Sequence, residues 1–439
     1  MDILLIHPKY THGPFVYRER GTLYGKLVAN PELTLPAVAA TIPKKHKVTI
    51  CHENFNGIEY SDKYDLVGIT CFTMFAPAVY KIADKYRSMG VPVVLGGYHP
   101  SALPMEAKKH ADSVVIGEAE YNFPRLIEDL EKGKLKPFYK VEKPVDANDI
   151  PALRRDVMPF DTMTDGIRIT RGCPHKCKFC SITSFFNHNY RKRPIKDVVE
   201  EIKGLKKKLM YIHDANLTVD LDYCKALFRE MIREKINKKW FANGNIYVLG
   251  KNEELLKLAR EAGCIGWTTG FESTTQRSLD GVSKEDNKVE KYAEWIGLVK
   301  KYGMSINGLF MFGFDHDTPD VFDSTIEALD RWEIDAAEFN ILTPLPGTPL
   351  YDEMDKDGRI LTKDWGRYTQ VEVVFKPKNM TPEELYEGTK RVIKEFQRMD
   401  KMMKRWARLL KLSCRTSTIA SMVTMDYSRR HWYKRDFKF

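Results

Sequence analysis

The chain has 439 residues, of which 43% are hydrophobic and 11% aromatic, so it can bury the cores of about two or three domains. A chain of this length with eight cysteines and no recognisable signal peptide is not a short secreted disulfide scaffold. No stretch reaches the ~18–20 apolar residues of a membrane-spanning helix. We therefore expect reduced thiols and a cytoplasmic location.

The formal net charge of +10 is concentrated near one end of the chain. Residues 396–439 contain twelve Lys or Arg and three Asp, a local net charge of +9, and the rest of the chain is close to neutral. The excess is a property of the C-terminal segment, so nucleic acid is not an expected partner.

Residues 1–140 alternate between apolar strand candidates and helical stretches, which predicts an α/β fold with a doubly wound, Rossmann-like parallel sheet. The strand candidates are 2–8, 47–53, 65–72, 91–100 and 113–118. Such sheets bind ligands beyond the carboxyl ends of their strands. The residues at those ends are Thr70, Cys71, Phe72, Gly96, Gly97, His99, Gly117 and Glu118. Ordinary turns between strands and helices are the alternative interpretation.

Residues 141–160 contain three prolines without apolar periodicity, and we interpret them as a linker. A second series of strands and helices follows over 161–350, with strand candidates at 166–172, 208–216, 240–246, 263–273, 304–314 and 336–350. Six strands predict a partial or complete βα barrel with its active site at the carboxyl ends of the strands. Residues 351–439 are expected to form a small, basic, helical extension.

Three cysteines, Cys173, Cys177 and Cys180, lie within eight positions directly after the first strand of this second series. A structural zinc site requires four ligands, and the remaining cysteines form no second pair. A redox Cys-x-x-Cys site would not need the third thiol. An iron–sulfur cubane held by three thiolates keeps one iron open to another ligand. We expect Cys224, Cys264 and Cys414 to be buried packing residues.

The spacing Cys-x3-Cys-x2-Cys, with Phe179 before the last cysteine, resembles the signature of the radical S-adenosylmethionine (SAM) enzymes. The resemblance implies a 4Fe–4S cluster whose open iron is chelated by SAM, which is cleaved reductively to a 5′-deoxyadenosyl radical. It also implies SAM contacts at the following strand ends, where the matching residues are Phe179, Asp214, Asn216, Asn243, Asn245, Glu272 and Ser273. Strand-end caps are the alternative. Residues 343–351 either close this site or form a rigid turn.

A doubly wound domain before such a barrel, with GGYHP at 96–100 and GEAE at 117–120, is similar to the cobalamin-binding radical SAM class. That class includes the hopanoid methylase and the anaerobic magnesium-protoporphyrin cyclase group. The resemblance implies cobalamin as a further cofactor. The Asp-x-His-x-x-Gly motif is absent, and His7 and His12 lack its neighbours, which argues against histidine ligation of cobalt more than against binding.

The leading hypothesis is a methylase that acts on an unactivated carbon of a hydrophobic substrate and receives electrons from an external flavodoxin or ferredoxin. A cyclase or ring-rearranging enzyme that transfers no methyl group is the second hypothesis. Methylthio transfer would require three cysteines in the first domain, which contains only Cys51 and Cys71. A cobalamin or iron–sulfur sensor is the non-enzymatic alternative.

In the basic segment, apolar residues recur at helical spacing and alternate with Lys and Arg; they are Met399, Met402, Met403, Trp406, Leu409 and Leu410. This pattern is typical of a basic amphipathic helix. One interpretation is a helix docked on the barrel with a solvated charged face. The other is a helix at an anionic membrane surface, which would suit a lipid-like substrate, with a carboxylated tetrapyrrole as the second choice.

Overall fold

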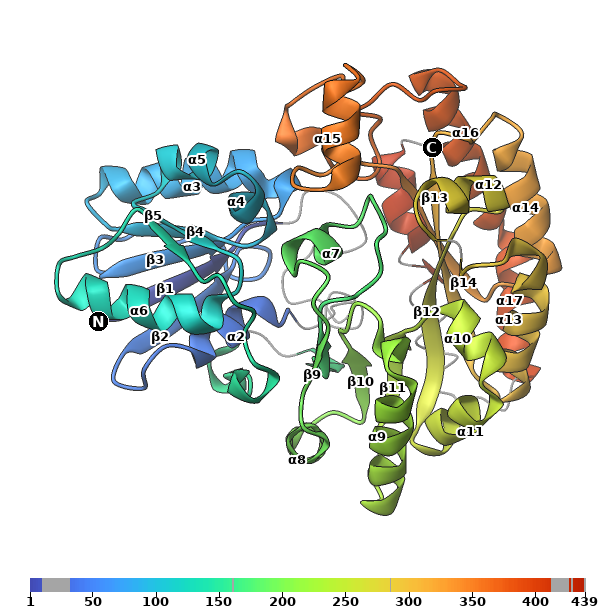
Figure 1. The fold of residues 1–439 in the computed structure, drawn as a ribbon, viewed down its shortest axis with the longest axis horizontal. Helices are drawn as coiled ribbons and strands as arrows, with labels where there is room; N and C mark the ends of the chain where they lie inside the picture. The colour runs from blue at the N-terminus through green and yellow to red at the C-terminus, as the bar shows by residue number, and fades with distance from the viewer. Residues whose placement is uncertain (10–31, 160–161, 285, 412–425, 428, 438–439) are drawn as a thin grey trace.

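The computed structural model describes residues 1–9, 32–159, 162–284, 286–411, 426–427 and 429–437. These residues form two α/β lobes that lie side by side, with the N-terminal lobe on the left of Figure 1 and the barrel lobe on the right. Helix α7 (Ser181–Phe185) lies between the two lobes. The predicted fold class, a doubly wound sheet followed by a partial βα barrel, is confirmed.

The N-terminal lobe contains six parallel strands in the order β2-β1-β3-β4-β5-β6. Their bounds are β1 (Asp2–His7), β2 (Lys47–His52), β3 (Leu66–Thr70), β4 (Val93–Gly96), β5 (Ser113–Ile116) and β6 (Phe138–Lys140). Five of them match the predicted strands, and the short edge strand β6 is an addition. The strand order reverses beside β1, and sheets of this topology bind ligands at that point beyond the carboxyl ends of the strands.

Helices cover both faces of this sheet; they are α2 (Thr34–Ala40), α3 (Ala76–Ser88), α4 (Tyr98–Ala102), α5 (Pro104–Ala107) and α6 (Ala119–Glu131). The buried side chains of α3 belong to one hydrophobic cluster and those of α2 and α6 to another. The strand predicted over 91–100 ends earlier than expected. Gly97 has a φ of +105°, which turns the chain into α4.

The barrel lobe also contains six parallel strands, in the order β14-β13-β12-β11-β10-β7. They are β7 (Asp165–Ile167), β10 (Leu209–Ile212), β11 (Lys239–Asn243), β12 (Cys264–Glu272), β13 (Ser305–Phe312) and β14 (Ala336–Ile341). The connections contain α8 (Ile195–Gly204), α9 (Leu221–Arg233), α10 (Ile246–Lys251), α11 (Glu253–Glu261), α12 (Gln276–Gly281), α13 (Tyr292–Lys301) and α14 (Val321–Arg331). Strands β7 and β14 do not pair, so the barrel is partial.

The C-terminal extension is more than a helical appendage. It contains α15 (Pro349–Lys356), α16 (Pro382–Phe396) and α17 (Met399–Lys411), and α15 crosses the boundary predicted at residue 350. Between α15 and α16 the chain packs onto the N-terminal lobe, where Trp365, Tyr368 and Val374 join the hydrophobic cluster of α3. The extension therefore holds the two lobes together.

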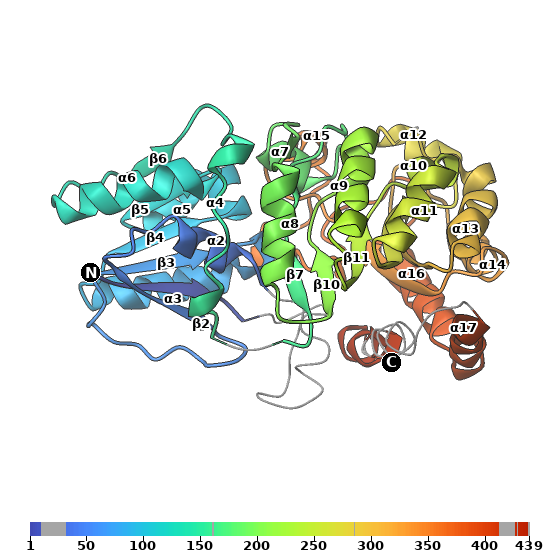
Figure 2. The same ribbon diagram turned by 90° about the horizontal axis from the view of Figure 1, so that it is seen from below.

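Helix α17 docks on the barrel, and its predicted apolar face is divided. Met402 and Leu409 are fully buried, and Leu409 packs against residues of β11, β12 and β14. Met399, Met403 and Leu410 are exposed. Figure 2 shows α17 at the end of the barrel opposite α7 and α15. Within the part of the chain that the structure describes, every helix is too short or too polar to span a bilayer.

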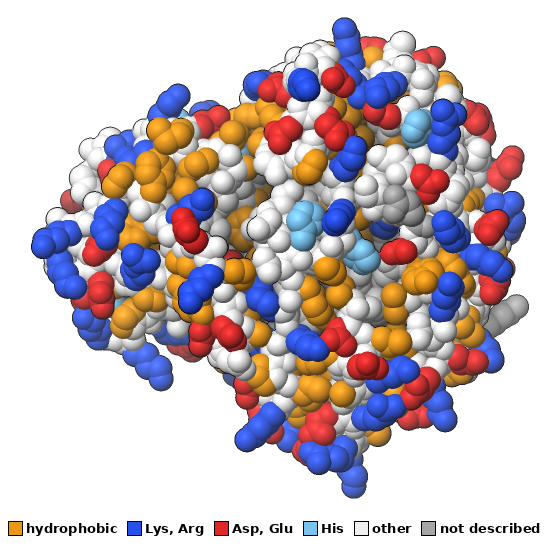
Figure 3. Space-filling model, viewed as in Figure 1, with side chains coloured by type: hydrophobic (Ala, Val, Ile, Leu, Met, Phe, Trp, Pro, Cys, Tyr) orange, Lys and Arg blue, Asp and Glu red, His pale blue; other side chains and the backbone are white. Residues whose placement is uncertain are grey.

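Much of the basic charge of this segment is paired within the protein. Lys401 binds Asp330 at 2.8 Å, Arg405 binds Asp426 at 2.7 Å, and Arg429 binds Glu338 at 3.1 Å. The helical residues 429–436 pack against β14, where the Tyr433 hydroxyl contacts the backbone of Phe339. Figure 3 shows Lys and Arg interspersed with Asp and Glu on the face viewed.

Candidate active site

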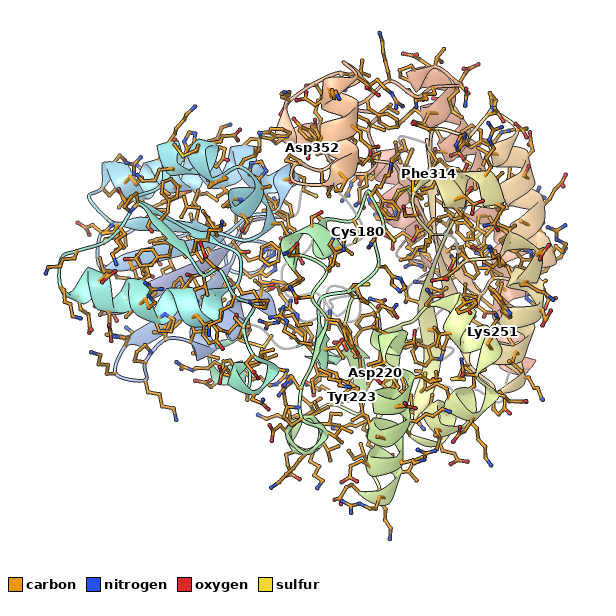
Figure 4. All side chains as sticks on the ribbon, viewed as in Figure 1. Cys180, Asp220, Tyr223, Lys251, Phe314 and Asp352 are labelled. Atoms are coloured by element: carbon orange, nitrogen blue, oxygen red, sulfur yellow. The ribbon has the colours of Figure 1, made fainter. Side chains whose placement is uncertain are left out.

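The three clustered cysteines lie on the loop that connects β8 (Thr170–Arg171) to α7. Cys173 is buried, and Cys177 and Cys180 are half-buried. The loop turns sharply, since the Cys180 N–H donates to the Cys177 carbonyl at 3.1 Å. At Gly172, φ is +80° and a Cβ would lie 1.8 Å from the carbonyl oxygen of Asn189, so only glycine fits. Cys180 lies near the centre of Figure 4, at the junction of the lobes.

Lys284 is the cation beside this loop. Burial raises the pKa of Cys173, and it raises the pKa of Cys177 to about 12, whereas the charge of Lys284 acts in the opposite direction on both thiols. The Lys284 ammonium also binds a carboxylate oxygen of Glu272 at 2.5 Å. Metal binding here must release protons from the thiols, and Lys284 favours that release.

The geometry is suitable for a cluster and unsuitable for a single ion. In the described ranges, no group of three His, Cys, Asp or Glu side chains could hold one metal ion. The thiolates of a cubane bind different irons, so three cysteines spread along one loop can hold three corners. Cys224 and Cys264 lie elsewhere, fully buried, with thiols donating to the carbonyls of Leu217 and Gly266. Cys414 is outside the described residues.

Asp214 supports the segment that leads into the cysteine loop. Its carboxylate accepts the backbone N–H groups of Ile169 and Thr170 at 2.8 and 2.9 Å and the Thr170 hydroxyl at 2.8 Å. Both oxygens are therefore engaged by the segment that leads into β8. The contact of Asp214 with SAM stays a prediction beside this positioning role. Burial raises the pKa of Asp214 to about 6.

The other predicted SAM residues lie at the carboxyl ends of neighbouring strands. Asn216 contacts the ring of His175 at 3.4 Å, and Asn243 accepts from the Tyr211 hydroxyl at 2.7 Å. Asn245 caps α10 by accepting the Tyr247 N–H. Asn216 and Asn245 thus cap the segments that follow their strands, and the Asn243 amide donates to the Asp214 carbonyl at 2.8 Å.

The end of β12 has an unusual conformation. Glu272 has a φ of +64° at an irregularity in the pairing of β12 with β13, and its carboxylate holds Lys284. The Ser273 hydroxyl accepts the Thr275 N–H at 3.1 Å. Phe179 packs near Phe314, which follows β13, with ring centroids 6.0 Å apart. A left-handed conformation is costly for a glutamate.

A narrow cavity of about 220 Å³ lies beyond the strand ends of the N-terminal lobe. Six of the eight residues predicted there line it: Thr70, Phe72, Gly96, Gly97, Gly117 and Glu118. Gly68 also lines the cavity, and a Cβ there would approach Leu5 to 2.9 Å. Glycines keep the cavity open between the lobes.

Cys71 and His99 are not among the residues that line this cavity, and their contact with cobalamin stays a prediction. Both side chains are buried below it. The Cys71 thiol donates to the Phe72 carbonyl, and the His99 ring lies 3.0 Å from the Tyr80 hydroxyl and 3.3 Å from Glu106. The ring of His7 is likewise buried, stacked on that of His52 at 4.5 Å, and His12 is outside the described residues.

The carboxylate of Glu118 joins the two lobes. It accepts from Arg171 at 2.9 Å and from Arg191 at 2.7 Å, two arginines on the strands that flank the cysteine loop. Arg171 also binds Glu120 at 2.6 Å. Glu118 therefore borders the narrow cavity while its charge is used by the barrel lobe.

A larger cavity of about 1200 Å³ continues from the narrow one and lies between the lobes. Phe72 and Tyr98 of the N-terminal lobe line it, together with Phe185 of α7, Asn340 of β14 and Trp432 of the C-terminal helical residues. The turn after β14 contributes Leu345, Pro346 and Gly347. This turn is braced by the Leu350 N–H, which donates to the carbonyl of Lys178 within the cysteine loop.

Comparisons with known proteins agree with this arrangement. Residues 46–127 match the B12 binding domain and residues 167–329 match the radical SAM superfamily. Bacteriochlorophyllide d C-12(1)-methyltransferase of Chlorobaculum tepidum is 32% identical over 387 residues, covering 85% of this chain and 84% of that protein. The chain belongs to the cobalamin-dependent radical SAM enzymes. The cofactors of this family are a 4Fe–4S cluster, SAM and cobalamin, and the cysteine loop and glycine-lined cavity fit them.

More distant members of the family are also similar. The anaerobic magnesium-protoporphyrin IX monomethyl ester cyclase of Cereibacter sphaeroides is 27% identical over 375 residues, 76% of this chain and 60% of that one. Hopanoid C-2 methylase of Rhodopseudomonas palustris is 23% identical over 378 residues, which cover 82% of this chain and 71% of that protein. The structure of the radical SAM methyltransferase TsrM from Kitasatospora setae has the same fold, with a TM-score of 0.65 and 16% identity. The match covers 89% of this chain and 88% of that one.

Several residues of the site carry no signal in a single sequence. Lys284 lies in a loop after α12, and Arg168 and His213 flank predicted motifs without belonging to them. Trp432 reaches the larger cavity from the far end of the chain. Their position depends on tertiary packing. The site features with a local sequence signature are the cysteine spacing and two strand ends, Gly96-Gly97 at the end of β4 and Gly117-Glu118 after β5.

Proposed function

We propose that this enzyme methylates an unactivated carbon of a hydrophobic small molecule held in the cavity between the lobes. The observation that carries the proposal is the continuous space of about 1200 Å³ that extends from the strand ends of the N-terminal lobe to α7, directly after the cysteine loop. A methyl donor on one side and a hydrogen-abstracting centre on the other can then act on one substrate carbon.

When bound, the cluster with SAM supplies hydrogen abstraction and cobalamin supplies the methyl group. The protein contributes position and exclusion of water. Cys173, Cys177 and Cys180 would hold the cluster, with Lys284 stabilising the thiolates. Phe72 and Phe185 line both cavities and contribute apolar surface where they join.

The substrate class we propose is a tetrapyrrole-sized ring. Its support is the volume of the cavity, its aromatic lining and the relation to bacteriochlorophyllide methyltransferases. A lipid-like substrate is the second candidate, supported by the relation to hopanoid methylase. An external one-electron donor of the flavodoxin or ferredoxin type is part of the proposal, as is contact of the exposed apolar residues of α17 with a membrane surface.

The test is anaerobic turnover of bacteriochlorophyllide d with reconstituted holoenzyme, a competent reductant and SAM carrying a trideuterated methyl group. We expect the product to gain one trideuteromethyl group in place of one hydrogen. Formation of 5′-deoxyadenosine together with an altered, unlabelled product would favour the cyclase hypothesis, which the 27% identity to the anaerobic cyclase supports. Recovery of unaltered bacteriochlorophyllide d would reject a tetrapyrrole ring as the substrate.

A further inference from the structure

Three polar side chains meet where the two cavities join. Thr34 begins α2, Arg168 lies between β7 and β8, and His213 follows β10. All three line both cavities. The Arg168 guanidinium donates to the Thr34 hydroxyl at 3.3 Å. Residues from three separate elements are thus brought to one point on the cavity wall.

Arg168 lacks a carboxylate partner of its own. Over the described ranges, no Asp or Glu forms an ion pair with it, and its one side-chain hydrogen bond goes to Thr34. The carboxylates that favour its charge are engaged elsewhere. Glu32 accepts the N–H groups of Thr34 and Leu35, and Glu120 binds Arg171. Burial lowers the pKa of Arg168, yet a guanidinium stays charged in proteins, so its donors face the cavity uncompensated.

His213 adds a neutral donor. Its Nε2 is buried and has no hydrogen-bond partner within the described part of the chain. The ring packs edge-on to Tyr211 with centroids 4.8 Å apart, which fixes its orientation. Burial, and the charges of Arg168 and Arg155, lower the pKa of His213 to about 3, so the ring is neutral at pH 7. Among the described residues, the buried Nε2 of His213 has no hydrogen-bond partner and the Arg168 guanidinium has only Thr34, an arrangement that is costly unless a ligand satisfies both.

We propose that Arg168, His213 and Thr34 form a subsite for an oxyanion, either a carboxylate of the substrate or the phosphodiester of cobalamin. A guanidinium pairs with such a group through parallel N–H bonds, and the imidazole and hydroxyl donate to its remaining oxygen positions. If the oxyanion belongs to the substrate, the inference rests on the proposed function and extends it. The hydrophobic substrate would then carry an acidic substituent that fixes the orientation of the substrate in the cavity.

The first experiment uses a hydrophobic probe from outside the proposed substrate class. Binding of 1-pyrenebutyrate and of its methyl ester to holoenzyme is followed by fluorescence. The wild type should bind the acid at least about tenfold more tightly than the ester, the effect of a charge-assisted hydrogen bond. Arg168→Gln should abolish this preference and Arg168→Lys should retain part of it. Arg229→Gln, an exposed arginine on α9, is the matched control.

Equal or undetectable binding of the acid by the wild-type holoenzyme rejects the substrate as the source of the oxyanion, because a bound phosphodiester would already fill the subsite. A preference for the acid that survives in Arg168→Gln overturns the subsite. The second experiment identifies the source by comparing cobalamin with cobinamide, which lacks the phosphodiester. Weaker retention of cobalamin alone by Arg168→Gln assigns the subsite to the cofactor. Unchanged retention of both assigns it to the substrate when the wild type prefers the acid, and overturns the subsite when it does not. Neither measurement uses turnover, so they stay informative if the methyl-transfer assay fails.

Discussion

Arg171, two residues before the first cluster cysteine, donates to Glu118 across the junction of the lobes at 2.9 Å. The side chains of both residues are nearly buried, 11% and 12% exposed. This ion pair couples the carboxyl end of β5 in the N-terminal lobe to the entry of the cysteine loop. The two cofactor regions are therefore held at a fixed separation by a contact that neither motif encodes.

Glu118→Gln tests this contact. The change leaves the guanidinium groups of Arg171 and Arg191 undercompensated in a buried position, so we expect the free energy of unfolding to fall by about 3 kcal/mol. Urea unfolding of the apo-protein measures it. Glu128→Gln, an exposed residue of α6 paired only with Lys132, should change stability little. Equal effects of the two substitutions would contradict the coupling.

Replacement of all three loop cysteines by Ala should abolish iron binding. Anaerobic reconstitution of the wild type is expected to yield about four iron atoms per chain, and the triple variant close to none. Cys224→Ala is the control, since that thiol is on the buried face of α9 and donates to a carbonyl at 2.9 Å. An iron content of about four in the triple variant would reject the cluster assignment.

The carboxyl group of Asp214 should make stability pH-dependent. Its folded pKa is raised to about 6, against about 3.9 in an unfolded chain, so between these values the folded protein binds the extra proton. The contribution of Asp214 to the free energy of unfolding therefore decreases as the pH rises from about 4 to about 6, by at most about 1.4 kcal/mol per pH unit.

Asp214→Asn removes this titration. The difference in unfolding free energy between the wild type and the variant should fall across that window and then level off, as measured by urea unfolding at a series of pH values. The similar titration of buried Asp317 is common to both proteins and cancels in the difference. Asp62→Asn, on the surface, is the control. A difference that stays constant with pH would show that Asp214 keeps its ordinary pKa.

The proposed membrane contact would be made by the exposed apolar residues of α17. Met399, Met403 and Leu410 are 49%, 62% and 68% exposed, next to the exposed Lys404. We expect the double substitution Met403→Glu with Leu410→Glu to abolish co-sedimentation with anionic liposomes at low salt. Met105→Glu, an equally exposed methionine on the N-terminal lobe, should leave it intact. Unaltered sedimentation of the double variant would eliminate the role of α17.

Local patterns predicted the sheets and the cysteine loop, because strand alternation and ligand spacing are properties of short segments. Carboxyl ends of parallel strands gather at one edge, which is why Thr70, Gly96 and Gly117 were found together. The side chain of Cys71 lies away from this cavity because neighbouring strand residues point to opposite faces, and that of His99 because the chain turns at Gly97.

The polar contacts of the site were harder to predict. Asp214 stands at a strand end where the family resemblance implies a contact with SAM, yet its hydrogen-bond partners include backbone N–H groups of a segment 45 residues earlier. The sequence could not predict which apolar residues of α17 dock on the barrel. Helical periodicity identifies an apolar stripe, but it does not identify the surface against which each residue packs. Arg168 had no signal because its significance lies in tertiary structure: the nearby carboxylates of Glu32 and Glu120 are engaged by other partners.

Tyr351, Trp365, Tyr368 and Val374 come from the extension yet belong to the core of the N-terminal lobe, where the Trp365 indole donates to Glu106 at 2.9 Å. The lobes are therefore not interchangeable modules. A chimera that takes its first 140 residues from a relative would expose or mismatch this apolar surface unless the segment from α15 to Val374 is exchanged with it. Recombination between family members should follow that discontinuous boundary in preference to the linker.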